Sequence, residues 1–445
     1  MHLNHESPAD LSVHPLRNSE DGQPATATSG ARRPPSATST FRAFVRQGDQ
    51  AGVQTVKQLP IRPNEVVIKL TTTSMCYTTS KRVLAPRDFA EAEIPGHVGV
   101  GIVEEIGSEV RRCKVGDRVL GNGTPQCGTC YNCVRGRAEW CEMLPMALGA
   151  RLPIAELSDG TPVYSEAGLG GTAEKMILHE DYVQPLHTSL SDSDVILVAD
   201  TAGLGFAAAD KPHRVQIGDN VVVLGAGPVG LGAIQSARAS GAGQIISVEP
   251  IAYRKELALK AGAHVVLDPN TYARGDGGMR GMPSDELVNA IKELCKGPND
   301  DRRSGGRDWG PLTALNRGAD VVIEAVGGDV VAPDTVTGPD PTGILPLRQA
   351  WEMCRAGGHV ITLGINQQGD VSFPATAFAI LGRTVHAAQA GGVNILQDMY
   401  RYHTVAERGV FDLSILEPTV FTLDQVPDAA RTALSRRVIS VTLAL

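Results

Sequence analysis

The sequence predicts an α/β protein with a β-rich first domain and a second domain built on a doubly wound parallel sheet. Three observations lead to this prediction. The chain has 445 residues, too many for one compact core and enough for two domains. Residues 41–190 contain short β-branched runs separated by Gly and Pro, a pattern typical of antiparallel or barrel-like structure. From about Val215, strand patterns alternate with helix patterns, which indicates a parallel sheet covered by helices.

The first forty residues carry no such pattern. Residues 1–40 are rich in Ser, Thr, Pro and Ala and have no hydrophobic periodicity. A secretory signal needs an apolar stretch of about 7–15 residues, and this segment has none. Residues 32–40 could belong to a targeting peptide, but Glu6, Asp10 and Glu20 weigh against it. We therefore expect a disordered tail on a cytoplasmic protein.

The expected elements follow in order along the chain. In the first domain we expect strands at Glu65–Leu70, Gly99–Glu104 and Asp117–Leu120. In the second domain we expect strands at Asn220–Leu224, Gln244–Val248, His264–Leu267, Asp320–Glu324, His359–Leu363 and Thr384–Ala387. A helix from Val229 to Ser240 should follow the first of these, and another should start at a Ser284 cap and end near Cys295. Segments 269–282, 297–317 and 328–343 resemble insertions, and the tail from about Gly391 could rejoin the first domain.

A glycine-rich turn joins the first strand and helix of the second domain. The run from Gly225 to Gly230 reads GAGPVG, and a strand before it and a helix after it make this GxGxxG pattern specific. Gly225 permits the tight turn, Gly227 lets the backbone approach a pyrophosphate, and Gly230 lets helix and strand pack closely. The helix N-terminus then offers N–H groups to phosphate. We expect a dinucleotide site rather than a purely structural turn.

An acidic residue closes the next strand. Glu249 lies nineteen residues after Gly230, where a carboxylate accepts hydrogen bonds from the adenosine ribose and repels a 2′-phosphate. This favours NAD over NADP, although Arg254 and Lys255 nearby count against the choice. We also place Arg254 among the cofactor-binding residues.

Four of the eight cysteines fall within fifteen residues. They are Cys127, Cys130, Cys133 and Cys141. In a reducing compartment such clustering indicates a metal rather than disulfides, and four thiolates can close a tetrahedron around structural Zn²⁺. An iron–sulfur cluster and four unliganded thiols are the alternatives.

These motifs resemble one protein family. Cys76, the Gly96–His97 turn, the four-cysteine segment and the GAGPVG turn occur in the order and spacing of the zinc-dependent medium-chain alcohol dehydrogenases. The resemblance runs from about Phe41 to Leu445, apart from the insertions, and is nearest to the formaldehyde dehydrogenase-like branch. It implies a GroES-like catalytic domain over residues 41–200, completed by 389–445, around a Rossmann NAD-binding domain over 201–388.

The resemblance also implies a catalytic zinc with an open coordination position. Cys76 and His97 match its first two ligands, and Asp200 lies where the third is expected, with Asp194 and Asp210 as competitors. Zn²⁺ would act as a Lewis acid on a bound alcohol, and hydride would pass to the nicotinamide. Two zinc ions per chain are expected.

The resemblance further implies a proton relay and two departures from the family pattern. Thr78 matches the hydroxyl that takes the alcohol proton. Val98 replaces the Glu that usually follows the zinc His, and Lys81 replaces a relay His. Lys81 would therefore end the relay or contact phosphate.

Composition excludes several other functions. The chain has 41 Lys+Arg against 49 Asp+Glu, a net charge of −8, whereas nucleic-acid binding needs a basic surface. It has no run of about 18 uncharged apolar residues, so we expect no membrane partner. The favoured function is alcohol–aldehyde or alcohol–ketone oxidoreduction with NAD(H), in a homo-oligomeric dimer or tetramer. A zinc-free quinone or enoyl reductase and a catalytically silent NAD-binding protein are the alternatives.

Overall fold

A computed structural model describes residues 39–84, 91–144, 152–211, 213–273, 285–296, 317–328, 344–365 and 370–445. Nearly all of the expected N-terminal tail and most of the three expected insertions therefore lie outside the described residues. The fold class predicted from the sequence is confirmed, because a β-rich part combines a barrel and an antiparallel-rich sheet while a second part is a parallel sheet.

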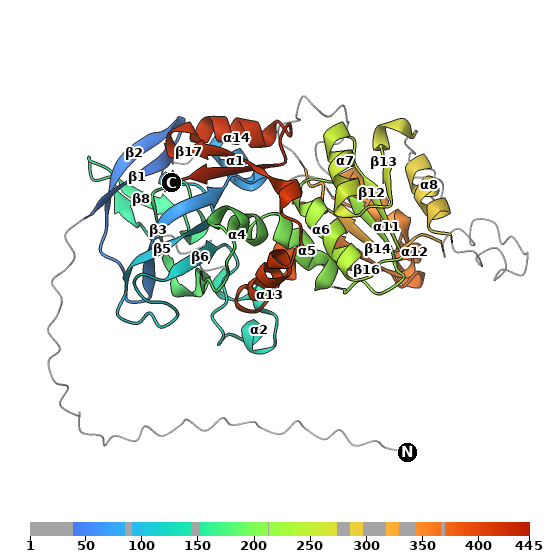
Figure 1. The fold of residues 1–445 in the computed structure, drawn as a ribbon, viewed down its shortest axis with the longest axis horizontal. Helices are drawn as coiled ribbons and strands as arrows, with labels where there is room; N and C mark the ends of the chain where they lie inside the picture. The colour runs from blue at the N-terminus through green and yellow to red at the C-terminus, as the bar shows by residue number, and fades with distance from the viewer. Residues whose placement is uncertain are drawn as a thin grey trace, which may run out of the picture. The chain divides into compact units, whose positions relative to one another are not determined.

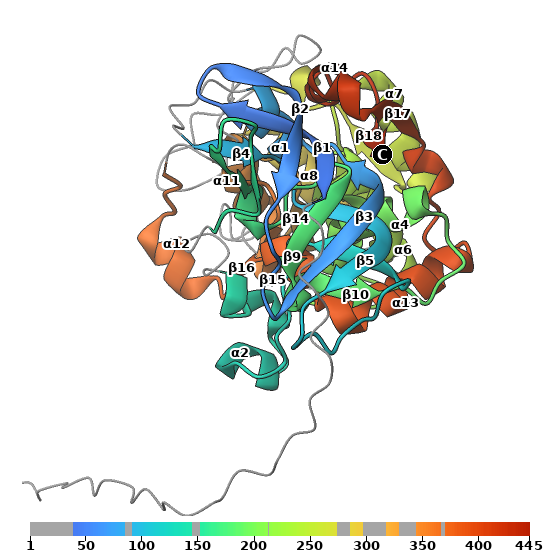
Figure 2. The same ribbon diagram turned by 90° about the vertical axis from the view of Figure 1, so that its left-hand side faces the viewer.

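The β-rich part contains a closed barrel, β1-β2-β7-β8-β4, and a sheet ordered β10-β6-β5-β3-β18-β17 with β9 also paired to β3 (Figure 1). Figure 2 shows β9, β3 and β5 side by side. The strands are β1 (Thr40–Gln47), β2 (Gln50–Gln58), β3 (Glu65–Ser74), β4 (Ala92–Ile94), β5 (Val98–Ile106), β6 (Arg118–Asn122), β7 (Ala155–Glu156), β8 (Pro162–Ser165), β9 (Lys175–His179), β10 (Val183–Pro185), β17 (Pro418–Thr422) and β18 (Ser440–Ala444). The helices of this part are α1 (Tyr77–Leu84), α2 (Tyr131–Val134), α4 (Asp192–Ala199), α13 (Ile395–Glu407) and α14 (Val426–Leu434).

The C-terminal tail returns to this sheet. Strand β18 pairs antiparallel with β3, so that Thr442 lies opposite Ser74, and parallel with β17. In Figure 1 the red α14 and β17 accordingly lie beside the blue β1 and β2. The last strand of the chain thereby supports β3, the strand that leads directly into Cys76.

Six parallel strands form the second part in the described residues, in the order β13-β12-β11-β14-β15-β16. This is the doubly wound order in which the connections change direction between β11 and β14, and ligands bind at that switch point. The strands are β11 (Asn220–Leu224), β12 (Gln244–Val248), β13 (Val265–Leu267), β14 (Ala319–Glu324), β15 (Cys354–Thr362) and β16 (Thr384–Ala387). The helices are α5 (Ala202–Asp210), α6 (Pro228–Ala239), α7 (Ala252–Ala261), α8 (Glu286–Leu294), α11 (Ile344–Met353) and α12 (Ala375–Ile380).

Short 3-10 turns connect several of these elements. They are η1 (Ala138–Trp140), η2 (Glu166–Gly168), η3 (Glu180–Tyr182), η4 (Pro269–Thr271), η6 (Gln389–Gly392), η7 (Ser414–Leu416) and η8 (Leu423–Gln425). Over the described residues, no helix combines the length and the apolar character that crossing a bilayer requires.

Buried hydrophobic residues explain the central strand. Val221, Val222 and Val223 of β11 are fully buried, as expected for a strand covered on both faces. One core, which packs α4, α5 and α6 on the sheet, extends to Val98 and Leu120 of the β-rich part. A separate core on the other face of the sheet contains Leu287 of α8 and Trp351 of α11.

Helices α5 and α6 pack with their backbones in close approach. A Cβ atom on Gly205 would lie 1.7 Å from the carbonyl oxygen of Val229, and one on Gly232 would lie 1.9 Å from that of Ala202. Both positions therefore require glycine, and the contact holds the start of α5 against the start of α6.

One expected helix start is wrong. Asp285, not Ser284, is the N-cap of α8, because its Oδ1 accepts hydrogen bonds from the N–H groups of Leu287 (3.1 Å) and Val288 (3.2 Å). A carboxylate satisfies the free N–H groups of a first turn as well as a hydroxyl does, so both residues fit the pattern. Ser284 lies outside the described residues.

Candidate active site

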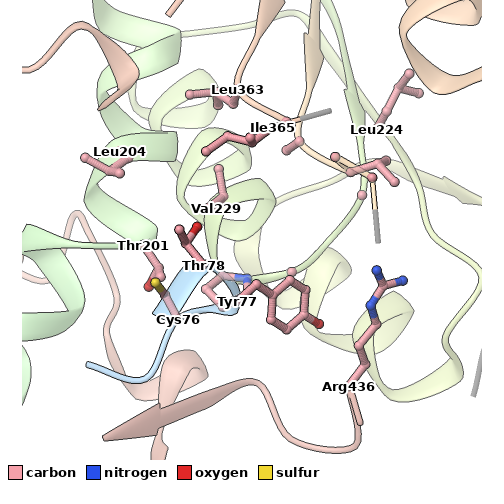
Figure 3. Close-up of a pocket in the computed structure, with 18 of the residues that line it drawn as sticks. Cys76, Tyr77, Thr78, Thr201, Leu204, Leu224, Val229, Leu363, Ile365 and Arg436 are labelled. Atoms are coloured by element: carbon pink, nitrogen blue, oxygen red, sulfur yellow. The ribbon is translucent and has the colours of Figure 1, made fainter. Parts of the chain in front are cut away.

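A cavity of about 740 Å³ is lined by residues of both the β-rich part and the parallel sheet (Figure 3). It contains most of the residues singled out from the sequence: Cys76, Thr78, Lys81, His97, Asp200, Gly225, Gly227, Glu249 and Arg254. Gly230 lies beneath the turn and does not line the cavity. The four-cysteine segment is a separate cluster.

At one end of the cavity three candidate metal ligands converge. Cys76 lies between β3 and α1, His97 lies between β4 and β5, and Asp200 ends α4 as its C-cap. The Sγ atom of Cys76 is 3.5 Å from Nε2 of His97, and that nitrogen is 3.4 Å from Oδ1 of Asp200. All three ligand atoms lie within 4.8 Å of one another.

Burial and charge at this cluster fit a cation. Asp200 is 7% exposed, and its buried Oδ2 has no hydrogen-bond partner in the described structure. Such an unpaired carboxylate oxygen is costly unless it binds a proton or a metal. Burial lowers the pKa of His97, but the facing Cys76 and Asp200 raise it well above the usual 6.5. The donor set of thiolate, imidazole and carboxylate is one that Zn²⁺ accepts.

The two competing aspartates lie elsewhere. Asp194 accepts a hydrogen bond from the Ser191 hydroxyl at 2.7 Å, within the first turn of α4. Asp210 contacts Arg401 at 3.0 Å and the hydroxyl of Tyr402 at 3.4 Å. Both carboxylates already have partners, and neither reaches Cys76.

Behind the cluster lies a residue that sequence reasoning missed. The hydroxyl of Thr79 is 3.4 Å from Nδ1 of His97 and 3.6 Å from Sγ of Cys76. Thr79 is fully buried in α1. A metal-binding imidazole commonly donates its second N–H to such an acceptor, which fixes the ring. The sequence feature that could have identified Thr79 is its position three residues after Cys76, which places both residues on the same face of a helix.

Thr78 and Lys81, the residues expected to form a proton relay, and Val98 line the same cavity. Val98 is buried at the start of β5, so the position after His97 offers no ligand atom. Nζ of Lys81 donates to the carbonyl oxygen of Gly328 at 2.6 Å, across the cavity. Burial and the neighbouring Arg436 lower the pKa of Lys81, while Cys76 opposes them. Thr78 lies close to Cys76 and Thr201 (Figure 3).

The glycine-rich turn has the geometry expected of a phosphate-binding loop. Gly225 has φ +88°, and a Cβ atom on Gly230 would lie 1.9 Å from the carbonyl oxygen of Gly225. Gly227 is the N-cap of α6 and Pro228 follows it, so the first N–H groups of α6 face the cavity end where phosphate is favoured. A Cβ atom on Gly227 would lie 3.7 Å from Nη1 of Arg254.

Glu249 supports this turn from beneath. It is 3% exposed, and its two carboxylate oxygens accept hydrogen bonds from the N–H groups of Ala226 (2.7 Å) and Ile251 (2.9 Å). The sequence prediction assigned this carboxylate to ribose hydroxyls. The structure adds a second role, which is to fix the glycine-rich turn.

Two further residues at this end were not assigned from the sequence. Arg436 follows α14, and its guanidinium lies 5.4 Å from the ring centroid of Tyr77. Tyr77 in turn accepts a hydrogen bond from Arg254 at 3.3 Å. Figure 3 shows Tyr77 extending toward Arg436 and away from Leu204. The register of Arg436 could not be read from one sequence because it depends on how the C-terminal tail returns.

The four cysteines form a second candidate metal cluster around α2 and η1. Their Sγ atoms lie within 4.8 Å of one another. Those of Cys127 and Cys133 are 3.9 Å apart, near the roughly 3.8 Å edge of a tetrahedron with Zn–S bonds of about 2.3 Å. A hydrogen bond from the Glu142 backbone lowers the pKa of Cys130 to about 6, whereas burial raises the pKa of Cys133 and Cys141. The spacing of the four sulfur atoms fits a tetrathiolate metal site.

Comparisons with known proteins agree with this geometry. Residues 62–188 match the family described as alcohol dehydrogenase GroES-like domain, and residues 228–337 match the zinc-binding dehydrogenase family. The S-(hydroxymethyl)glutathione dehydrogenase of Escherichia coli O1:K1 / APEC is 31% identical over 383 residues, which cover 83% of this chain and 89% of that protein.

Two solved structures share the fold. The benzyl alcohol dehydrogenase of Acinetobacter calcoaceticus has a TM-score of 0.70 and 20% identity, covering 92% of this chain and 99% of that chain. A zinc-binding dehydrogenase of Sinorhizobium meliloti 1021 bound to NADP has a TM-score of 0.61 and 22% identity, covering 92% of this chain and 100% of that chain.

Proposed function

This chain belongs to the zinc-dependent medium-chain alcohol dehydrogenase family and is an alcohol/aldehyde oxidoreductase, and we propose that it works with NAD(H) and two zinc ions per chain. One zinc would be held by Cys76, His97 and Asp200, and the other by the four cysteines. The observation that carries the catalytic assignment is the convergence of Cys76, His97 and Asp200. The buried Oδ2 of Asp200 also has no hydrogen-bond partner among the described residues.

The chemistry divides between the bound groups and the chain. The zinc would supply a Lewis acid that lowers the pKa of an alcohol, and the nicotinamide would accept the hydride. The chain would supply two negative charges, on the Cys76 thiolate and the Asp200 carboxylate. Together they would balance the two positive charges of Zn²⁺. The substrate oxygen would then carry the extra negative charge of the site.

The chain also moves the proton. We assign the Thr78 hydroxyl, beside Cys76 in the cavity, to accept the alcohol proton while it releases its own proton toward the nicotinamide ribose. Lys81, which reaches Gly328, would end this path or contact a cofactor phosphate. These roles extend to ketones as products, since a secondary alcohol loses its proton and hydride in the same way.

NAD rather than NADP is supported by two contacts. Glu249 presents its carboxylate at the end of β12, where a 2′-phosphate would be repelled. Lys255, a cation that could attract such a phosphate, is held by Asp268 at 2.7 Å. Gly225, Gly227 and Gly230 shape the pyrophosphate turn, and Arg254 would supply the nearby positive charge.

A homo-oligomer is supported by the edge of the parallel sheet. Strand β16 ends that sheet, and Val385 on it is 39% exposed, with Phe378 and Ile380 of α12 at 54% and 67%. An exposed apolar edge strand favours pairing with a second copy. The eight free cysteines support a reducing compartment, which we take to be the cytoplasm.

The first experiment counts zinc per chain on metal-replete wild type, Cys76→Ser and Cys113→Ser. We expect two zincs in wild type, one in Cys76→Ser, and two in the control Cys113→Ser, whose buried thiol belongs to neither cluster. Wild type should also reduce NAD⁺ with a panel of primary alcohols, and Cys76→Ser should not. One zinc in all three proteins would instead favour the reductase or the silent NAD-binding protein.

A further inference from the structure

Four residues form a closed set of contacts at the cofactor end of the cavity. Nη2 of Arg254 donates to the hydroxyl of Tyr77 at 3.3 Å, and Nε of Arg254 donates to the hydroxyl of Tyr253 at 3.0 Å. The Tyr253 hydroxyl donates to the carbonyl oxygen of Arg436 at 2.8 Å. The Arg436 guanidinium lies 5.4 Å from the Tyr77 ring centroid, which closes what we call the tyrosine–arginine ring.

This ring joins the two parts of the protein. Tyr77 begins α1, and Arg436 lies between α14 and β18, so both belong to the β-rich part. Tyr253 and Arg254 lie in α7, on the parallel sheet. Two hydrogen bonds of the ring, from Arg254 to Tyr77 and from Tyr253 to Arg436, therefore connect the parallel-sheet part with the β-rich part. Each would have to break if the two parts separated there.

The ring also holds two positive charges where phosphate is expected. Arg254 is only 5% exposed, and its Nη1 lies 3.7 Å from where a Cβ atom of Gly227 would be. Arg436 lines the same cavity. Two guanidinium groups repel one another, and the Tyr77 phenol lies between them, with its oxygen toward Arg254 and its ring face toward Arg436. A bound anion would relieve the remaining repulsion.

The backbone of Arg436 supports a functional reading. Its φ is +58°, in the left-handed region that glycine normally occupies just after a helix. Arginine at such a position is strained, and strain of this kind concentrates at functional sites. This conformation gives one residue two contacts in the ring, through its carbonyl oxygen and its side chain.

We propose that Tyr77 and Tyr253 are positioning residues that hold Arg254 and Arg436 against the phosphates of the dinucleotide and thereby slow the release of NADH. The inference rests on the proposed NAD(H) dependence. It concerns the two tyrosines, whose role the glycine-rich turn and the metal cluster leave undefined.

The test measures NADH on the full-length, zinc-loaded enzyme. Tyr253→Phe removes two hydrogen bonds of the ring, and Tyr77→Phe removes one while it keeps the aromatic face under Arg436. Stopped-flow displacement should give an NADH dissociation rate about tenfold higher in Tyr253→Phe and a smaller rise in Tyr77→Phe, since a hydrogen bond to a charged group accounts for roughly that factor. KM for NAD⁺ should rise while kcat stays constant or increases.

The matched control is Tyr131→Phe. Tyr131 also has an arginine over its ring, Arg135 at 5.1 Å, but it lies on the four-cysteine segment and is 64% exposed. The Tyr131→Phe variant should have the same NADH dissociation rate as wild type. Arg436→Gly serves as a second probe, because glycine suits the left-handed backbone. We expect it to keep the melting temperature at or above that of wild type and to weaken NADH binding.

Two results separate this inference from the proposed function. If wild type oxidises alcohols with NAD⁺ but Tyr77→Phe, Tyr253→Phe and Arg436→Gly release NADH at the wild-type rate, the positioning role is wrong and the proposed function stands. If wild type neither binds NADH nor oxidises alcohols, the proposed function is wrong and the inference falls with it.

Discussion

The imidazole of His97 is fixed from two sides. Its Nε2 faces Cys76 and Asp200, and its Nδ1 faces the hydroxyl of Thr79 at 3.4 Å. A metal on Nε2 requires that Nδ1 carry the proton, and this N–H can donate a hydrogen bond to the Thr79 hydroxyl oxygen. A neutral hydroxyl thus orients the ring without adding a third negative charge to the cluster.

Removing this hydroxyl should weaken zinc binding at the proposed catalytic site. We expect Thr79→Val to lower the affinity of this zinc by about tenfold, because outer contacts to a ligating His typically contribute at least that much. Competition with a chromogenic chelator measures it. Thr72→Val is the matched control, since Thr72 is also buried but donates to the carbonyl oxygen of Leu443. Equal zinc affinity in the two variants would show that Thr79 only fills space.

Among the elements, the edge strand β16 of the parallel sheet and the edge strand β17 of the β-rich sheet differ in environment. Strand β16 presents the exposed Val385, and the preceding α12 adds the exposed Phe378 and Ile380, whereas β17 presents Val420, which is 59% exposed. Unpaired strand edges next to apolar side chains bind further strands unless charge prevents it. The β16 edge is therefore the better candidate for contact between copies.

A charge on β16 should disrupt the proposed homo-oligomer. We expect Val385→Lys to shift the protein toward the monomer, because a lysine on an edge strand opposes pairing. Light scattering after gel filtration, over a range of concentrations, measures the change in mass. Val420→Lys on β17 should leave the measured mass equal to that of wild type. A monomeric wild type, or equal masses for both variants, would remove β16 as the contact.

At the scale of the whole molecule, the buried His403 and the half-buried His359 link stability to pH. Burial lowers the pKa of His403 to about 4. Burial, with His213 and His386 next to the ring, lowers the pKa of His359 to about 4. Nδ1 of His359 lies 2.9 Å from Nε2 of His386. The ring of His213 stacks on the ring of His359, with 3.4 Å between the ring centroids. Both side chains are therefore neutral in the fold at neutral pH.

Acid should destabilise the fold through these groups. Between pH 6.5, the ordinary histidine pKa, and about 4, the unfolded chain binds protons that the folded chain does not. Stability is thus fully present above pH 6.5 and falls as the pH drops. Urea midpoints at pH 8, 6 and 4.5 should decline less for His403→Gln and His359→Gln than for wild type. Parallel declines in all three proteins would assign the acid sensitivity to other groups, such as metal ligands.

Local patterns in the sequence determined the features that short stretches of chain encode. The strands Asn220–Leu224, Gln244–Val248 and Thr384–Ala387 were predicted with the bounds that the structure has, because buried β-branched runs and the glycine-rich turn set these elements locally. The four cysteines lie within one segment of fifteen residues, so their short spacing in the sequence already indicated that they are close in space. Cys76 and His97 depended on the order of several motifs.

Tertiary structure alone decided which distant groups meet. Asp200 stood among three candidate aspartates until the end of α4 brought it to His97, and the place of Arg436 depended on the pairing of β18 with β3. Thr79 and Tyr77 likewise gained their partners only through packing. The sequence by itself thus determined the fold class, the glycine-rich turn and the four-cysteine cluster, whose contacts are local. The third candidate ligand and the tyrosine–arginine ring join segments more than a hundred residues apart, and only the packing of the two parts fixes such contacts.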